Sequence, residues 1–477
     1  MNSSTKGNWW TSTQNSATNA WNLNNGSLNN NNKTNTNNNA LPFYEIDMRN
    51  KAEWLSLEDL WGAYEDCRYR KRNTESCAKF EFDEIKNIYD LWKDLNNKTY
   101  EIGYSNAFIV TRPKLREVFA ADFRDRIVHH LIIMKTLPLF ESNFIQDTYN
   151  CRKRKGTLYG IERVKHKIGL NDNCWILKLD LQGFFMSINK EMLRDKLRSF
   201  IFENYKGEDI NEIWWLIDMI VMHNPERKCI IKGDKTKLAS LPASKSLLKG
   251  DGSKGMAIGN LTSQIFANFY LSDLDNYLSS IPNIEYGRYV DDFILIGAKS
   301  DLLRILHNLK DWLWDNLQVK LHPDKIYLQQ NKMGVSFVGA VLKDDRTYIN
   351  NRTVGNCIAT IKHYNKLSES SIENEIERFA QRFNSYMGFM IHHKTYAIRW
   401  KLWNLISDDI KKFVYMTNGM KTLKVRKKYK TITKLLEKYG SKKLFFGSDT
   451  PIDGVDTYGK NPKGKPSLYQ RYFHELE

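Results

Sequence analysis

The fold is decided by residues 288–296, which read Arg288-Tyr289-Val290-Asp291-Asp292-Phe293-Ile294-Leu295-Ile296. Two adjacent carboxylates interrupt a run of aromatic, β-branched and aliphatic residues, which favour extended backbone. This pattern predicts two strands, over 284–290 and 293–298, with the carboxylates at the tight turn between them. Such a turn can also be no more than a charged hairpin tip, so a second signal is needed to assign a function.

The second signal is Asp180, which ends the short apolar strand predicted over 175–180 and is followed by Gly183-Phe184-Phe185. Two strands can bring Asp180 and Asp291 together, and their charges then repel one another unless a cation lies between them. Mg²⁺ accepts such hard oxygen ligands while keeping waters and substrate phosphates. A pair of these ions stabilises both the attacking and the leaving oxygen in phosphoryl transfer. The two segments therefore indicate a metal-dependent site, and the alternative for Asp180 is a solvated strand end.

The composition narrows the class of protein. The chain has 477 residues, about three times the usual size of a domain, so two or three structural units are expected. Its 72 Lys and Arg residues outnumber 55 Asp and Glu residues, and the net charge of +17 points to a polyanionic partner, nucleic acid first. No stretch approaches the ~18 apolar residues of a membrane span. The six cysteines form no CxxC pair and the start carries no secretory pattern, so we expect reduced thiols and a cytoplasmic location.

Periodicity along the rest of the chain predicts helices interleaved with strands. Helices are expected over 56–70, 83–95, 124–140, 190–203, 211–223, 262–278 and 300–316. Strands are expected in a hairpin around Pro113 and in a pair near 326–343, and residues 232–255 are expected to form a long loop. The last third of the chain is helical and basic in pattern. This order predicts an α+β core with a helical appendage.

Five segments, taken in chain order, resemble the successive palm motifs of reverse transcriptases. They are Asp180 with Phe184-Phe185, Ile258-Gly259-Asn260-Leu261-Thr262-Ser263-Gln264, Tyr289-Val290-Asp291-Asp292, Lys325, and Gly334-Val335-Ser336-Phe337-Val338-Gly339. Upstream, Arg116 and the run from Asp122 to His130 resemble the fingers motifs of the same family. The resemblance covers roughly residues 50–400.

The resemblance implies an α+β right-hand polymerase. Its parts would be fingers over 41–175, a palm with an antiparallel sheet over 176–345 that includes insertions of the fingers, a helical thumb over 346–420 and a basic tail over 421–477. A disordered extension over 1–40 would precede them, because fifteen of these residues are Asn and eleven are Ser or Thr, which is too polar a composition to form a core.

The same resemblance implies an RNA-directed DNA polymerase, a nucleotidyltransferase, and assigns roles residue by residue. Asp180 and Asp291 would hold two Mg²⁺ ions, with Mn²⁺ as the alternative metal, together with the main-chain carbonyl of Leu181. Asp292, the third carboxylate of the catalytic set, would support the turn and could touch the primer side. Lys325 lies where the family has a candidate general acid for the pyrophosphate leaving group.

Further roles concern the nucleotide and the primer. Arg116 would hold the triphosphate through bidentate hydrogen bonds, and Lys114 would assist, although a solvated charge is the alternative for Lys114. Phe185 would exclude a ribose 2′-hydroxyl and so select dNTPs, with core packing as its alternative. The resemblance also places Ile258, Gly259 and Gln264 on the dNTP side, and Tyr289, Gly334, Phe337 and Gly339 on the primer side.

Two departures from the usual family pattern indicate a subgroup. Most members have Gln before the Gly and Pro after the Ser of the central motif, whereas this chain has Ile258 and Gln264. This combination is similar to the reverse transcriptases of diversity-generating retroelements, which copy a template RNA with errors at adenines. Residues 124–130 and 151–157 resemble the same subgroup. The missing amide at Ile258 predicts relaxed discrimination between nucleotides, and lineage drift without a change in fidelity is the alternative.

The expected partners are template RNA, the RNA/DNA hybrid, dNTPs and a small basic accessory protein, in the service of mutagenic retrohoming. One rival interpretation is a reverse transcriptase of a retron, a mobile intron or a phage-defence system. Another is a polymerase-dead scaffold that binds RNA, against which the retention of all three aspartates counts. The basic tail over 421–477 could grip template RNA or form a solvated helix.

The Asn-rich start has a second interpretation. Residues 8–39 resemble the variable segment of diversified lectin-fold proteins, and Asn codons begin with two adenines. These residues could therefore be a translated template repeat, in which case the true start lies near Met48; a flexible leader is the ordinary alternative.

Overall fold

The computed structural model describes residues 53–430 except 70, 72–73, 112–114, 171–172 and 344–345. It consists of two units, Met1–Glu53 and Trp54–Glu477. Of the first unit only the backbone of four strands is described, namely β1 (Asn8–Gln14), β2 (Asn19–Asn24), β3 (Ser27–Asn32) and β4 (Asn38–Ala40), paired in the order β3-β2-β1-β4. The sequence predicts disorder over 1–40, and the other residues of this segment lie outside the described part.

The second unit begins with three helices that bury one face each, α1 (Leu57–Arg68), α2 (Glu75–Glu81) and α3 (Glu84–Asn96). The Ser56 hydroxyl accepts a hydrogen bond from the Asp59 N–H and caps α1 as its position predicts. The long helix α4 (Phe123–Asn143) follows, and Asp122 caps it. The predicted helices over 56–70, 83–95 and 124–140 are confirmed within a few residues.

The predicted hairpin around residue 113 is also confirmed and gains a third strand. It comprises β5 (Ser105–Val110) and β6 (Arg116–Ala120), and β8 (Cys229–Ile231) pairs parallel with β5. The expectation of a loop over 232–255 is wrong at α9 (Lys235–Ala239), because the Asp234 side chain accepts from two N–H groups and starts a short helix there.

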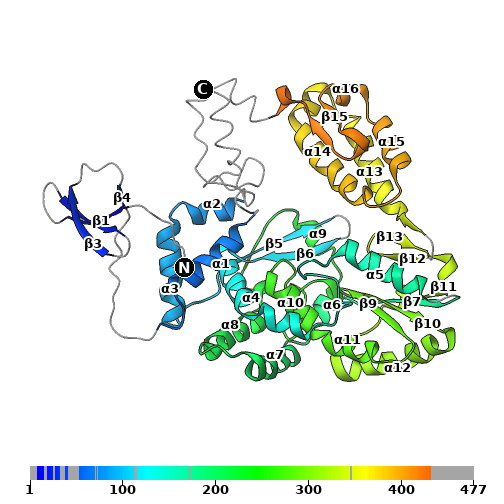
Figure 1. Cartoon of the computed structure of the whole chain (residues 1–477), viewed down its shortest axis with the longest axis horizontal. Coiled ribbons are helices and arrows are strands. Elements are labelled where there is room, and N and C mark those ends of the chain that lie inside the picture. Colours follow the sequence, from blue (N-terminus) through cyan, green and yellow to red (C-terminus); the bar gives the residue numbers. More distant parts are fainter. Residues whose placement is uncertain are drawn as a thin grey trace. The chain divides into compact units, whose positions relative to one another are not determined.

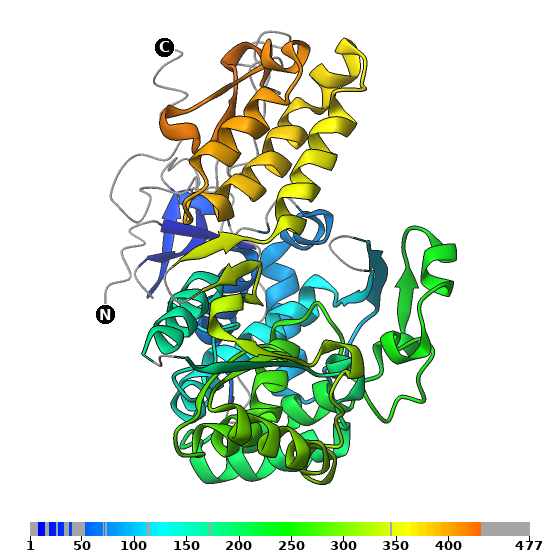
Figure 2. The same ribbon diagram turned by 90° about the vertical axis from the view of Figure 1, so that its right-hand side faces the viewer.

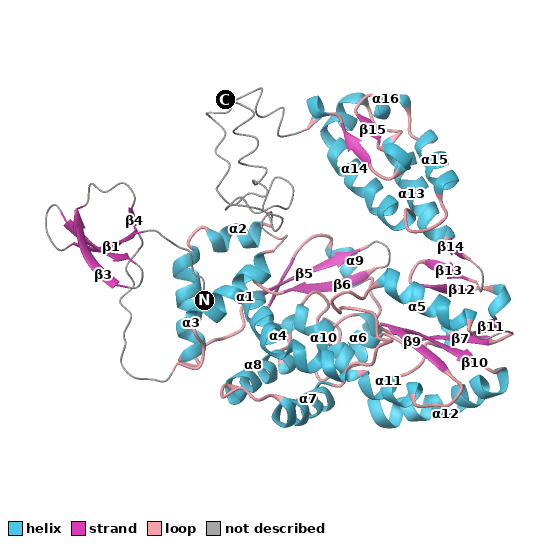
Figure 3. Cartoon of the chain, in the orientation of Figure 1, coloured by secondary structure: helices cyan, strands magenta, loops and turns pink. Residues whose placement is uncertain are grey.

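The central sheet has the strand order β11 (Tyr327–Gln330), β7 (Trp175–Asp180), β10 (Asp292–Gly297) and β9 (Glu285–Tyr289), and all of its neighbours are antiparallel. Its side chains alternate between two cores. Leu177, Leu179, Phe293 and Leu295 belong to the large core that includes α12 (Lys299–Leu317), whereas Ile176, Ile294 and Ile296 belong to a smaller one that includes α5 (Thr157–Gly169). Figures 1 and 3 show the sheet above α12.

The expected helix over 262–278 is divided in two, and this part of the prediction is wrong. The structure has α10 (Leu261–Tyr270) and α11 (Ser272–Ser279), which meet at Leu271. The Ser272 hydroxyl donates to the Phe269 carbonyl at 2.7 Å, and the Lys196 ammonium donates to the same carbonyl at 2.9 Å. These side chains compete with the helical hydrogen bonds and end α10.

Three further α-helices lie between β7 and β8 in the chain, and the last two confirm the helices predicted over 190–203 and 211–223, whereas the first was not predicted. They are α6 (Phe184–Ser187), α7 (Lys190–Asn204) and α8 (Ile210–Met222). No helix in the described ranges combines the length and the apolar character needed to cross a membrane.

The C-terminal part has a small antiparallel sheet and a separate helical core. The sheet contains β12 (Val335–Phe337), β13 (Ala340–Leu342) and β14 (Thr347–Ile349). The helices are α13 (Asn351–Tyr364), α14 (Glu369–Met390), α15 (Tyr396–Asn404) and α16 (Asp408–Lys411), followed by the paired strands β15 (Val414–Met416) and β16 (Leu423–Val425). Figure 2 shows these helices packed side by side.

An antiparallel sheet covered by helices, together with a helical C-terminal bundle, is the α+β right-hand polymerase fold that the sequence predicts. Residues 431–477, most of the predicted basic tail, lie outside the described part.

Candidate active site

The site is built where β7 and β10 end. Their register pairs Asp180 directly with Asp292, so the two carboxylates predicted from separate segments lie on neighbouring strands. The Leu181 N–H donates to the Asp291 carbonyl at 3.2 Å and continues this pairing past the end of the sheet. The structure therefore brings Asp180, Leu181, Asp291 and Asp292 together.

The turn between β9 and β10 has an unusual backbone. Val290 has a φ of +60°, in the left-handed region that β-branched residues avoid. A residue held there costs on the order of 1–3 kcal/mol and persists only where its surroundings impose the conformation. The strain lies one residue before Asp291, so the direction of this carboxylate depends on how the turn is held.

Burial and mutual repulsion shape the electrostatics. Burial raises the pKa of Asp291, and the negative charge of Asp180 raises it further. Burial also raises the pKa of Asp292, to about 6, although the Lys178 ammonium at 3.0 Å from its Oδ2 acts in the opposite direction. The other oxygen, Asp292 Oδ1, is buried and has no hydrogen-bond partner in the described part of the chain. A cation at this site would relieve each of these costs.

Lys325 lies at the same site, at the end of a short 3₁₀ turn over Pro323–Lys325. Its Nζ is 2.5 Å from Asp180 Oδ1, and the side chain is partly exposed. The His322 N–H donates to the Asp180 carbonyl at 2.8 Å and fixes this segment beside β7. The predicted proton donor thus contacts a predicted metal ligand.

The donor set fits a hard divalent cation. The described residues contain no cluster of three or more His, Cys, Asp or Glu side chains arranged around one point. The available donors are the Asp180 and Asp291 carboxylates and the Leu181 carbonyl, all of them oxygens. Mg²⁺ is typically bound by one or two carboxylates and completed by waters and substrate phosphates. Asp292 Oδ1, which is buried and has no hydrogen-bond partner in the described part of the chain, is a further oxygen near these donors.

The predicted nucleotide side lies between β6 and the loop before α10. The Phe119 N–H donates to the Ile258 carbonyl at 3.0 Å, which holds the loop against the strand that Arg116 begins. Gly259 has a φ of +132°, and a Cβ there would lie 2.9 Å from the Phe119 carbonyl oxygen, so only glycine fits. Arg116 is exposed, and its charge acts on Asp291.

Phe185 is joined to this region by its backbone. Its carbonyl accepts from the Met256 N–H at 2.8 Å, and its half-buried ring packs edge-on against Phe184 at 5.6 Å between centroids. Phe184 is buried in the large core and Phe185 only borders it. Lys114, predicted to assist Arg116, lies outside the described residues.

Gln264 is exposed on α10 and has a partner that the sequence did not reveal. The Cys151 thiol donates to Gln264 Oε1 at 3.0 Å. Sequence reasoning also missed Lys178, whose signal was available: it is the one polar residue before Asp180 in the apolar strand Trp175–Asp180. No local signal connects Cys151 with Gln264.

The residues predicted on the primer side have different surroundings. Tyr289 is half-buried, and its hydroxyl accepts from Thr157 Oγ1 at 3.4 Å. Phe337 is completely buried in the smaller core, so its ring is not available to a primer. Gly334 and Gly339 both have positive φ and flank this strand; a Cβ on Gly339 would lie 3.3 Å from the ring of Phe389. A primer contact of this segment would therefore have to come from its backbone or from exposed side chains such as that of Ser336.

Comparisons with known proteins agree with this arrangement. The family model described as reverse transcriptase (RNA-dependent DNA polymerase) matches residues 113–342. Protein YkfC of Escherichia coli strain K12 is 23% identical over 263 residues, which cover 47% of this chain and 62% of that protein. The chain therefore spans less than two thirds of this curated relative.

Solved structures give more distant similarities. Apo telomerase from Candida tropicalis has a TM-score of 0.40 and 11% identity, covering 66% of this chain and 62% of that chain. Telomerase from Candida albicans in complex with a fragment of telomeric RNA has a TM-score of 0.36 and 12% identity, covering 72% and 63%. Scores at this level carry no argument about function. The family match, by contrast, encloses the whole β7–β10 site, because residues 113–342 are similar to the reverse transcriptase family model.

Proposed function

We propose that this protein is an RNA-directed DNA polymerase that uses a divalent metal ion. The observation that carries the proposal is the pairing of Asp180 with Asp292 across β7 and β10, with Asp291 at the adjoining turn. This places carboxylates from two strands of a reverse transcriptase domain at one point. When bound, the metal neutralises charge on the attacking and leaving oxygens of phosphoryl transfer.

The residues of this chain have separate tasks in that reaction. Asp180, Asp291 and the Leu181 carbonyl hold the metal, and Asp292 supports the turn. Lys325 holds a proton at Nζ within reach of the site, where it can be donated to the leaving pyrophosphate. The tasks of the remaining residues are substrate binding and exclusion. Arg116 binds the triphosphate, the Phe185 ring excludes a ribose 2′-hydroxyl, and the loop at Ile258 and Gly259 bounds the nucleotide site on the side of β6.

The nucleic-acid partners are template RNA and the RNA/DNA hybrid. The chain carries a net charge of +17, which favours a polyanion. On α15 the rings of Tyr396 and Trp400 are exposed beside the exposed Lys401, a combination that suits contact with a nucleic-acid strand. We assign fingers, palm, thumb and basic tail to residues 41–175, 176–345, 346–420 and 421–477 as part of this proposal.

The test is Asp291→Asn, which removes one anionic ligand and leaves the basic surface unchanged. We expect it to abolish Mg²⁺-dependent extension of a DNA primer on a homopolymer RNA template, while RNA affinity stays near that of the parent. The matched control is Asp311→Asn, because Asp311 is an exposed aspartate on α12 and has no proposed role in the site. Substantial extension by Asp291→Asn would refute the metal assignment, and an inactive parent that still binds RNA would favour the scaffold interpretation.

We further propose that the enzyme belongs to a diversity-generating retroelement and copies its template with errors at adenines. Ile258 and Gln264 support this subtype. The thiol of Cys151 bonds Gln264 Oε1, so the Gln264 amide is left with its NH₂ group to donate to a nucleotide or a base. A small basic accessory protein and a template repeat over codons 8–39 belong to the same proposal. A near-copy of those codons at the end of a neighbouring gene, differing mainly at adenines, would support it, and its absence would favour a retron, mobile-intron or phage-defence enzyme.

A further inference from the structure

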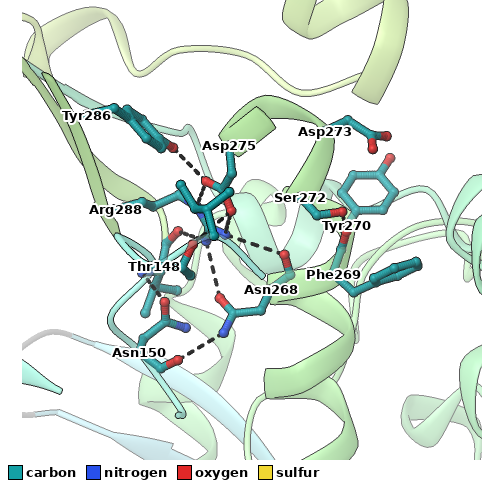
Figure 4. A network of polar contacts seen from close by, with 12 residues as sticks. Thr148, Asn150, Asn268, Phe269, Tyr270, Ser272, Asp273, Asp275, Tyr286 and Arg288 are labelled. Atoms are coloured by element: carbon teal, nitrogen blue, oxygen red, sulfur yellow. Dashed lines mark hydrogen bonds and ion pairs between the residues drawn. The ribbon is translucent and has the colours of Figure 1, made fainter. Parts of the chain in front are cut away.

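Beneath the turn lies a buried ion pair that the proposed chemistry does not use. Arg288 on β9 is completely buried, and Asp275 on α11 is nearly so. Their contact is bidentate, with Nε 2.6 Å from Asp275 Oδ1 and Nη2 2.5 Å from Oδ2. Figure 4 shows the two side chains at the centre of a polar network. Burial of two charges is costly, and hydrophobic residues of similar volume are often as stable, so stability alone is a weak reason for such a pair.

The Asp275 carboxylate also accepts hydrogen bonds from two neutral hydroxyl groups. The Tyr286 hydroxyl donates to its Oδ1 at 2.7 Å, and the Thr148 hydroxyl donates to its Oδ2 at 3.1 Å. These contacts hold the carboxylate in one position, and the carboxylate in turn fixes the plane of the Arg288 guanidinium. The orientation of Arg288 is therefore set from three elements of the structure: α11, β9 and the segment at Thr148.

The free end of the guanidinium reaches the turn. Arg288 Nη1 donates to the Val290 carbonyl at 2.8 Å and to Asn268 Oδ1 at 3.2 Å. The Val290 N–H donates to Asn150 Oδ1 at 2.9 Å, and Asn268 Nδ2 donates to the Asn150 carbonyl at 2.9 Å. Both polar backbone groups of Val290 are therefore held by buried side chains. This is the residue with a φ of +60°, next to Asp291.

We propose that Arg288 and Asn150 are positioning residues that impose the left-handed conformation of Val290 and so aim Asp291 at Asp180. The inference rests on the proposed function, because it names what orients one of its metal ligands. The network also joins the turn to α10, where Asn268 lies one helical turn after Gln264. The turn and the proposed nucleotide side are thus braced by one set of hydrogen bonds.

The network supplies its own matched controls. Thr148→Val and Tyr286→Phe each remove one hydrogen bond to Asp275 and keep the size of the side chain, whereas the side chains that hydrogen-bond to Val290 are those of Arg288 and Asn150. Asn150→Ala removes the acceptor of the Val290 N–H and leaves the ion pair in place. Asn150→Asp keeps an acceptor oxygen at the same position. A purely structural role would make activity follow thermal stability in the same way for all four variants.

The experiment measures the melting temperature, the kcat and KM for dNTP, and Mn²⁺ binding by electron paramagnetic resonance without nucleic acid. We expect Asn150→Ala to lower kcat on the order of tenfold to hundredfold with little change in KM, because a misplaced catalytic group slows the reaction by such factors. Its Mn²⁺ affinity should fall several-fold. Thr148→Val and Tyr286→Phe should lower both properties much less than Asn150→Ala at comparable melting temperatures, because the bidentate contact between Arg288 and Asp275 remains. Asn150→Asp should restore Mn²⁺ binding.

The proposal is overturned if Asn150→Ala loses no more kcat and no more Mn²⁺ affinity than the two controls of equal stability. Failure of the proposed function looks different, because the parent itself would then not extend a primer. The Mn²⁺ measurement still decides the positioning role in that case. Arg288→Lys gives a second comparison, since a lysine keeps a cation beside Asp275 but lacks the fork that reaches Val290 as well. It should behave like Asn150→Ala, and behaviour like the controls would count against the proposal.

Discussion

Replacing Asp292 by asparagine removes the charge of this carboxylate while nearly keeping its size. Burial raises the pKa of Asp292 to about 6, Lys178 lowers it, and the charges of Asp180 and Asp291 raise it. A carboxyl group whose pKa is higher in the folded protein binds its proton more tightly there than in the unfolded chain. Its stabilising contribution is full below the unfolded pKa of about 4 and is lost as the pH rises through the folded pKa.

The size of the effect follows from the shift. About two pKa units correspond to ~3 kcal/mol between the fully protonated and fully ionised limits. The unfolded carboxyl is already largely ionised at about pH 4.5, so part of this free-energy difference is lost below that pH. From about pH 4.5 to about pH 7.5 the free energy of unfolding should therefore change by about 2 kcal/mol. Relative to Asp292→Asn, the free energy of unfolding of the parent should therefore fall by about 2 kcal/mol over this range. The interaction with Lys178 is already contained in this figure, because it is one of the causes that set the pKa of Asp292 in the folded protein.

The assay is urea unfolding in EDTA at both pH values, followed by tryptophan fluorescence, to which Trp175 on β7 contributes. Asp311→Asn on the exposed side of α12 serves as the control and should change equally with the parent. Mg²⁺ should stabilise the parent more than the Asp292→Asn variant at the higher pH. Parallel pH profiles for parent and variant would refute the reasoning that burial and repulsion act on Asp292.

Three further substitutions test the nucleotide side. Gly259→Ala should destabilise the protein by about 1–3 kcal/mol because a Cβ would meet the Phe119 carbonyl at positive φ, and an unchanged melting temperature would contradict this. Phe185→Val should raise rNTP incorporation relative to dNTP incorporation in competitive primer extension. An unchanged ratio would favour the alternative that Phe185 only packs against the core. Ile258→Gln should lower misincorporation opposite template adenine more than opposite the other bases, and an identical error spectrum in sequenced cDNA would place the infidelity elsewhere.

The convergence of Asp180 and Asp291 was predictable because it follows from short-range patterns. Each lies beside an apolar run with the pattern of a buried strand, and two such strands can pair as neighbours and bring the carboxylates together. The helices over 56–70, 83–95 and 300–316 were predictable for the same reason, since each has one continuous apolar face. These features depend on periodicity, which a single sequence contains.

The parts that could not be predicted depend on contacts between distant residues. The break at Leu271 arises because Lys196 and Ser272 take a helical carbonyl, and nothing near residue 271 indicates that a lysine from α7 arrives there. The bond from Cys151 to Gln264 joins two exposed side chains from different segments. Phe337 lies in a motif that the resemblance assigns to the primer, but its ring fills the core beneath the sheet.

The site brings together carboxylates that repel one another, and neighbouring cations and hydrogen bonds offset part of this repulsion. Asp180 is contacted by Lys325, Asp292 by Lys178, and the strained Val290 between them is held by Asn150 and Arg288. Asp180 and Asp292 therefore each have a cation on one side, while Asp292 keeps a buried oxygen without a hydrogen-bond partner in the described part of the chain. A fold selected for stability alone would have removed the repelling charges and the strained residue. The site departs from the usual preferences of a stable fold, and contacts from several distant segments compensate for this. Such a combination is expected at a functional site.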